Sequence, residues 1–168
     1  MENLYKELRS FFANDIDLTD LFDSEAIIWI DWREYDEDVV NYFNDMMDEP
    51  IDIEIVSNGK PYGDDIVLKN GNKELQIPYG DEQDRDVTIK YFNDFVKPDY
   101  EVRWFAESLG NDTLGFTVLS GAEWANLEDE FGADTVRYYF EPIDLESNMF
   151  NLDMDEVSAL LELRENNR

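Results

Sequence analysis

Carboxylates are the main side chains of this sequence that could carry acid–base or metal chemistry. Its 168 residues include 42 Asp and Glu, but neither His nor Cys. Without these two types, the chain cannot form a Ser-His or Cys-His nucleophile pair, the common zinc sites or a disulfide. Carboxylates leave two kinds of site open, namely a glycosidase pair and a metal site with oxygen ligands.

Two acidic clusters have spacings that invite a metal-site interpretation. Residues 151–156 alternate like the opening of a calcium loop, but the required glycine and distant glutamate are out of register. The second cluster is interpreted as a solvated turn rather than a metal site, and comprises Asp15, Asp17, Asp20 and Asp23. No particular pair stands out among so many acids. We therefore expect no catalytic residue, no metal and no cofactor, and a protein that is not an enzyme.

The charge balance is more informative than any of these motifs. The net charge is −29, which is far more than solubility requires and which costs stability through self-repulsion. Residues 14–54 hold fifteen acids and one base, and residues 123–165 hold thirteen acids and two bases. This concentration predicts an anionic face for a basic protein partner, and it disfavours nucleic acids and anionic membranes. A generally acidic surface and adaptation to high salt are the alternative interpretations.

A four-residue string occurs twice, at residues 42–45 and 91–94, and reads YFND in both places. Each copy lies near the end of a helix-like stretch and precedes a proline and two strand-like runs. We interpret this as an α-β-β unit used twice, over residues 36–78 and 85–120, with chance and shared local physics as the alternative. If the repeat is real, Phe43 and Phe92 occupy matching core positions.

Hydrophobic periodicity predicts a single α+β domain over residues 1–168, with a mainly antiparallel sheet and helices packed on one face. The apolar fraction of 43% is too high for a disordered acidic chain. The predicted helices cover residues 3–14, 36–48, 86–96, the stretch after Ser120, and 153–165. The predicted strands cover residues 25–32, 51–56, 65–69, 73–78, 100–106, 113–119 and 135–141.

The helix at residues 36–48 presents an outward acidic stripe opposite its apolar one, and its exposed side is the predicted binding surface. Tyr35 is added because tyrosine is favoured at the centres of protein interfaces. The predicted partner-binding residues are Asp15, Asp17, Asp20, Asp23, Tyr35, Asp36, Glu37, Asp38, Asp45 and Asp48.

In size, lack of cysteine and acidic balance, the chain resembles the small immunity proteins that neutralise bacterial polymorphic and contact-dependent toxins. The likeness extends to the DNA-mimicking inhibitors of phages and plasmids, and it covers general character without a shared motif. It implies a cytoplasmic binding protein that blocks a basic toxin, with a nuclease as the expected target. That location fits the absence of a signal-like start and of a long apolar segment.

Two other functions stay open at this point. A DNA mimic would occupy a restriction, repair or CRISPR protein, because these enzymes also present basic surfaces to phosphates. A carboxylate-based hydrolase or a metal binder would instead depend on one or two particular acids.

Overall fold

The computed structural model describes residues 2–31, 34–59, 64–79, 84–109 and 113–166. Its helices are α1 (Glu2–Phe12), α2 (Leu18–Phe22), α3 (Asp36–Met46), α4 (Arg85–Val96), the 3-10 turn η1 (Ala106–Ser108), α5 (Gly121–Phe131), α6 (Ala133–Tyr139) and α7 (Met154–Asn166). Its strands are β1 (Ile28–Asp31), β2 (Asp52–Ser57), β3 (Asp64–Asn70), β4 (Lys73–Gln76), β5 (Tyr100–Phe105), β6 (Thr113–Ser120) and β7 (Phe140–Pro142).

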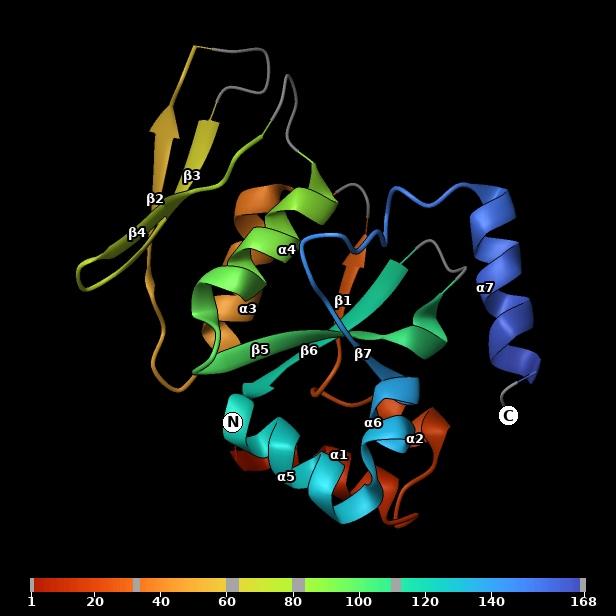
Figure 1. Ribbon diagram of the computed structural model, residues 1–168. Helices are drawn as coiled ribbons and strands as arrows, with labels where there is room; N and C mark the ends of the chain where they lie inside the picture. The colour runs from red at the N-terminus through yellow and green to blue at the C-terminus, as the bar shows by residue number, and fades with distance from the viewer. Residues whose placement is uncertain (1, 32–33, 60–63, 80–83, 110–112, 167–168) are drawn as a thin grey trace.

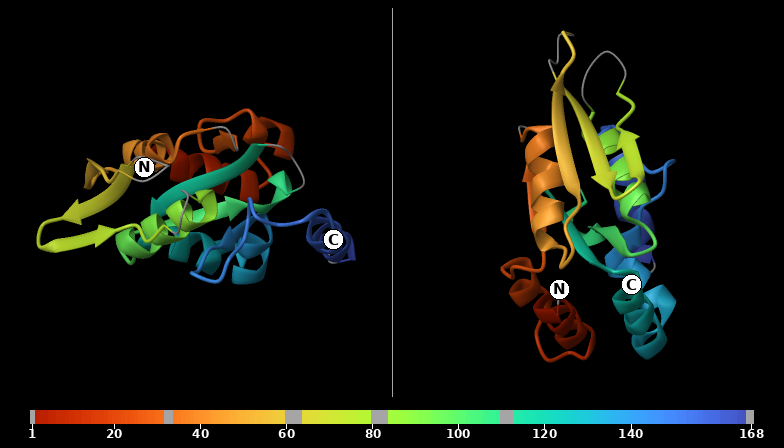
Figure 2. Two further views of the ribbon diagram at one scale, coloured as in Figure 1. Left: turned by 90° about the horizontal axis from the view of Figure 1, so that it is seen from above. Right: turned by 90° about the vertical axis from the view of Figure 1, so that its left-hand side faces the viewer.

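The strands form two antiparallel sheets, which confirms the predicted α+β class (Figure 1). The larger sheet has the order β1-β6-β5-β7, and the smaller one has the order β2-β3-β4. The smaller sheet stands beside α3 and α4, and the ends of β2 and β3 project beyond these helices in Figures 1 and 2. The predicted turn at residues 110–112 and the end of the first predicted strand at Trp32 lie outside the described residues.

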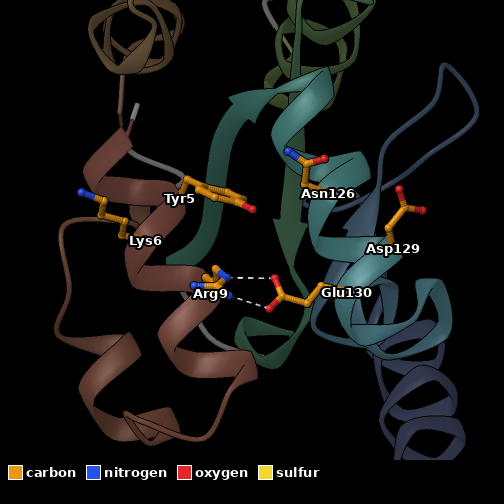
Figure 3. A pocket seen from close by; sticks show the side chains of 6 residues that line it. All are labelled: Tyr5, Lys6, Arg9, Asn126, Asp129 and Glu130. Carbon is orange, nitrogen blue, oxygen red and sulfur yellow. Dashed lines mark hydrogen bonds and ion pairs between the residues drawn. The ribbon is translucent and has the colours of Figure 1, made fainter.

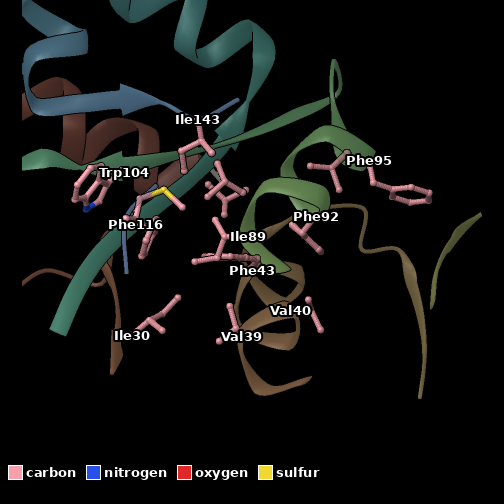
Figure 4. Close-up of a cluster of buried hydrophobic side chains, with 14 of the residues drawn as sticks. Ile30, Val39, Val40, Phe43, Ile89, Phe92, Phe95, Trp104, Phe116 and Ile143 are labelled. Carbon is pink, nitrogen blue, oxygen red and sulfur yellow. The ribbon is translucent and has the colours of Figure 1, made fainter. Parts of the chain in front are cut away.

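Helices cover both faces of the larger sheet, whereas the sequence predicted that they pack on one. The central strands β5 and β6 are buried along most of their length, as is typical of a sheet covered on both faces, although β5 also carries the paired Glu101 and Arg103 on one side. Trp104 and Phe116 belong to a cluster that α3 and α4 cover, shown in Figure 4. Phe105 and Leu119 belong to a second cluster, which α1, α2, α5 and α6 cover.

The sequence also predicted a strand at residues 135–141, but the structure has α6 followed by the short strand β7. Val136 and Phe140 are both fully buried, and a spacing of four fits one helical face as well as two strand positions. The capping box predicted at Ser120 is confirmed, because Ser120 Oγ accepts the N–H of Glu123 at 3.1 Å.

The two YFND helices pack against each other on one face of the larger sheet. Phe43 and Phe92 are both fully buried, as predicted, with their ring centroids 5.5 Å apart. The asparagine of each copy holds the backbone that follows. Asn44 Oδ1 accepts the N–H of Ile51 at 2.8 Å, and Asn93 Oδ1 accepts the N–H of Val102 at 2.7 Å. The helix–hairpin order is therefore the same in both units, although their hairpins enter different sheets.

Candidate protein-binding face

The outer side of α3 combines aromatic and acidic side chains. Tyr35, the residue before the helix, is 72% exposed, and Tyr42, about two helical turns further along, is 39% exposed. Asp38 is half-buried between them and Asp45 is exposed. Residues 35, 38, 42 and 45 follow the three- and four-residue spacing of one helical face. The structure thus places the predicted Tyr35, Asp38 and Asp45 on one stripe.

Asp36 belongs to the interior, which corrects its assignment to the binding surface. Its side chain is 6% exposed, and its Oδ1 accepts the Nε–H of Arg85 at 2.8 Å. Arg85 also donates to the carbonyl oxygens of Asp31 and Glu34. Burial raises the pKa of Asp36, although the bond from Arg85 opposes the rise. Through Arg85, Asp36 therefore links the start of α3 to the backbone of Asp31 and Glu34.

Tyr42 is a surface residue that the sequence did not single out. Its hydroxyl donates to Glu34 Oε2 at 3.2 Å, which holds the phenol ring against the start of the helix. Partial burial and the neighbouring Glu34 carboxylate raise the pKa of Tyr42, so its hydroxyl remains a hydrogen-bond donor at neutral pH. The signal in the sequence was its seven-residue separation from Tyr35, since two helical turns place both rings on one side.

The acidic surface continues from α3 into β2. Between residues 34 and 57 the sequence has nine acids and no base. Asp48 lies just beyond the end of α3 and is exposed, as predicted; Glu37 is half-buried. We define the α3–β2 face by its exposed or half-buried members Tyr35, Glu37, Asp38, Tyr42, Asp45, Asp48, Glu49, Asp52 and Glu54.

A cation from the neighbouring strand reaches this face. Lys69 Nζ on β3 lies 2.5 Å from Glu54 and 3.5 Å from Glu74. Lys69 is 40% exposed, so this cluster is accessible to solvent and retains a net negative charge. The right-hand view of Figure 2 shows β2 on the side of α3 and β4 on the side of α4.

The acids at residues 15–23 do not join the α3–β2 face. They are exposed, but they surround α2, which covers the opposite side of the larger sheet (Figure 1). Asp17 and Asp20 each accept the backbone N–H of the other, at 2.8 and 3.2 Å, in a capping box. Asp23 is the residue that ends α2. We predicted that these four acids belong to the partner-binding surface, but the structure places them on a separate surface from α3.

A concave region lies elsewhere, between α1 and α5 (Figure 3). Arg9 makes two hydrogen bonds with the Glu130 carboxylate, at 2.8 and 2.7 Å. These bonds lower the pKa of Glu130, so the pair is fully ionised and neutralises itself. Tyr5 and Asn126 also line the groove. The arrangement ties the two helices together.

Buried ionisable groups outside this face have structural roles. The Asp86 carboxylate is 1% exposed and accepts the N–H groups of Met149, Phe150 and Asn151, at 3.1, 2.8 and 2.9 Å. It thereby holds the segment before α7 against α4. Arg103 lies over the Trp124 ring and bonds Glu101 and Glu128. No local pattern in the sequence indicates these partners.

These features define an α+β protein with an exposed acidic–aromatic face. Within the described residues, no group of His, Cys, Asp and Glu is arranged to hold a metal ion, and no helix has the length and apolarity needed to cross a membrane. Comparisons with protein-family models, curated proteins and solved structures found no match to this chain.

Proposed function

We propose that this chain is an immunity protein that binds and neutralises a basic toxin of the nuclease class. The α3–β2 face is the observation that supports the proposal. Its segment of the sequence contains acids but no base, and two exposed tyrosines lie beside these acids. A nuclease must present Lys and Arg to phosphates. An acidic face is therefore steered to it, and occupying that surface blocks the substrate.

Within this proposal, charge and aromatic groups have separate tasks. The acids accelerate encounter, and their effect decreases as salt screens them. Tyr35 and Tyr42 supply apolar contact area and hydroxyl groups, which hold the complex after encounter. The proposal places the protein in the cytoplasm, where a chain without cysteine needs no oxidative folding.

The test begins with capture of the partner from cells of the native source and its purification. We expect its association rate with this chain to fall steeply between ionic strengths of about 0.01 and 0.15 M, where the screening length shrinks from roughly 30 to 8 Å. A salt-insensitive rate would remove the electrostatic basis. Capture of a restriction or repair enzyme would favour the DNA-mimic alternative, and hydrolysis lost on a single Asp or Glu substitution would favour an enzyme.

Charge reversal locates the surface. The triple variant Asp38→Lys, Asp45→Lys, Asp48→Lys changes the net charge from −29 to −23, and we expect association at least about tenfold slower. The matched control reverses three exposed acids elsewhere, Asp129→Lys, Glu146→Lys and Glu162→Lys, with the same net charge. Equal slowing in both variants would show that net charge matters and the α3–β2 face does not. Circular dichroism checks that both variants remain folded.

A further inference from the structure

β2 is an edge strand with an unusual exposure of apolar side chains. It pairs with β3 on one side, and no described strand pairs with the other. Five of its six residues are exposed, including Ile55 at 39% and Val56 at 41%. An exposed edge with apolar side chains is a template for pairing with another strand.

The register decides which backbone groups of β2 point to the free edge. In an antiparallel ladder, the N–H and C=O of one residue point to the same neighbouring strand, and successive residues alternate. Ile77 N–H donates to the carbonyl oxygen of Ile66 at 2.9 Å, so Ile66 directs its backbone groups toward β4. Ile55 lies opposite Ile66. Ile55 therefore directs its own N–H and C=O away from β3, as does Ile53 two residues earlier.

A side chain already pairs with the backbone just before β2. The Asn44 amide donates to the Ile51 carbonyl oxygen and accepts the Ile51 N–H, both at 2.8 Å, as a neighbouring strand would. Ile53 and Ile55 follow Ile51 at intervals of two. An incoming strand would thus begin where Asn44 stops and would lie beside the α3–β2 face.

We propose that the basic partner docks by adding a strand to the free edge of β2, a proposal that rests on the function proposed above. The side chains of β2 specify this strand. Asp52 and Glu54 share the outer face, where Lys or Arg would be complementary, and Ile53 and Ile55 share the inner face, where apolar residues would pack. A strand that alternates basic and apolar residues therefore fits the edge.

Two of the registers in which two copies of β2 could pair bring acids directly opposite each other. Pairing two β2 strands about Glu54 places the two Glu54 side chains opposite each other, and pairing about Ile53 places Asp52 opposite Glu54. Like charges in directly opposed positions are destabilising. Two molecules of net charge −29 also repel each other over the whole surface.

One substitution removes a donor from the edge without removing a bond to β3. Ile55→Pro lacks the outward N–H, and proline is tolerated in an edge strand where that group faces solvent. Ile55→Thr is the matched control, because it reduces the apolar surface to a similar extent but retains the N–H and the β-branched shape. Because Ile55 is 39% exposed, both variants should fold.

The probe is a synthetic peptide of about eight residues, long enough for a typical strand, in which Lys and Val alternate. We expect its addition to shift the amide NMR signals of Ile53 and Ile55 and to slow their hydrogen exchange. Ile55→Pro should weaken binding about tenfold, and Ile55→Thr by much less. Equal binding by both variants, or equal binding of a peptide with its Lys residues grouped at one end, would overturn strand addition.

The captured toxin separates this proposal from the proposed function. Slower association of the α3 charge-reversal variant, together with unchanged affinity of Ile55→Pro, would retain the immunity function and refute the docking mode. Loss of toxin binding in Ile55→Pro, with binding retained in Ile55→Thr, would support the docking mode.

Discussion

At the scale of single residues, the side chain that pairs with an acid decides whether the acid lies in the interior or at the surface. Asp36 and Asp38 are only two positions apart. Asp36 is buried and paired with Arg85, whereas Asp38 remains on the outer stripe. Glu128 is another partnered acid, with Arg103 and Arg137 each 3.0 Å from its carboxylate. Burial by itself would raise the pKa of Glu128, but the hydrogen bonds from these arginines outweigh burial and lower it.

This depressed pKa predicts how stability depends on pH. The contribution of Glu128 is fully present above its ordinary pKa of 4.5 and is lost as the pH falls through the lower value of the folded state. Glu128→Gln should therefore reduce the free energy of unfolding by about 1–3 kcal/mol at neutral pH, and by progressively less toward pH ~3. Urea unfolding at several pH values measures this, with the exposed Asp129→Asn as control. A cost that does not change with pH would contradict the assignment.

At the scale of elements, the repeated string marks a helix whose asparagine fixes the backbone that follows. Asn93 is 1% exposed, and its Nδ2 also donates to the carbonyl oxygen of Ile143 at 2.9 Å. Asn44 is partly exposed, so water can replace its bonds to Ile51 more easily. The same local sequence thus makes the same kind of contact in both units, but the contact is buried at Asn93 and partly exposed at Asn44. The shared element order and contact support duplication, which remains a proposal.

This difference in depth predicts unequal costs of truncation. Asn93→Ala leaves the buried Val102 N–H without its partner and leaves the Ile143 carbonyl oxygen with only the bond from Lys97. It should cost about 2–4 kcal/mol, whereas Asn44→Ala should cost about 1 kcal/mol. Asn41→Ala, on the exposed side of α3, should change stability by less than about 0.5 kcal/mol. Chemical denaturation of the three variants gives the ranking. Equal costs at positions 44 and 93 would refute the role of burial.

At the scale of the whole molecule, two apolar clusters on either side of one sheet stabilise the fold, whereas repulsion among the acidic side chains destabilises it. The net charge is −29, and arginines such as Arg85 and Arg103 are buried in ion pairs. The acids that remain exposed repel one another across the surface, and the strength of this repulsion depends on salt.

Salt should therefore stabilise this protein. We expect the free energy of unfolding to rise by about 1 kcal/mol between low salt and physiological ionic strength, which raises Tm by roughly 2–4 °C for a domain of this size. Thermal unfolding at increasing concentrations of sodium chloride measures the change. The variant with lysines at positions 129, 146 and 162 should gain less, since it carries less charge. A Tm that falls with salt would show that the ion pairs outweigh the repulsion.

The sequence by itself determined the features that depend on neighbours within a few residues. These include the α+β class, most helices and hairpins, the capping box at Ser120, the burial of Phe43 and Phe92, and the excess of negative charge. Helical and strand periods are local properties, and so is charge. Val136 and Phe140 are four residues apart, a spacing that fits both the helical and the strand period, so the local pattern could not distinguish a helix from a strand there.

Only the tertiary structure decided which residues share a surface. Asp36 is drawn inside by Arg85, 49 positions later, and Asp86 is held by backbone groups more than 60 positions away. The apolar residues on the two sides of β5 and β6 are covered by different sets of helices, and this separates α2 and its acids from α3. Among the described strands, β2 is left at an edge because its hairpin belongs to a separate sheet. Such outcomes depend on long-range packing, which a local sequence pattern does not predict.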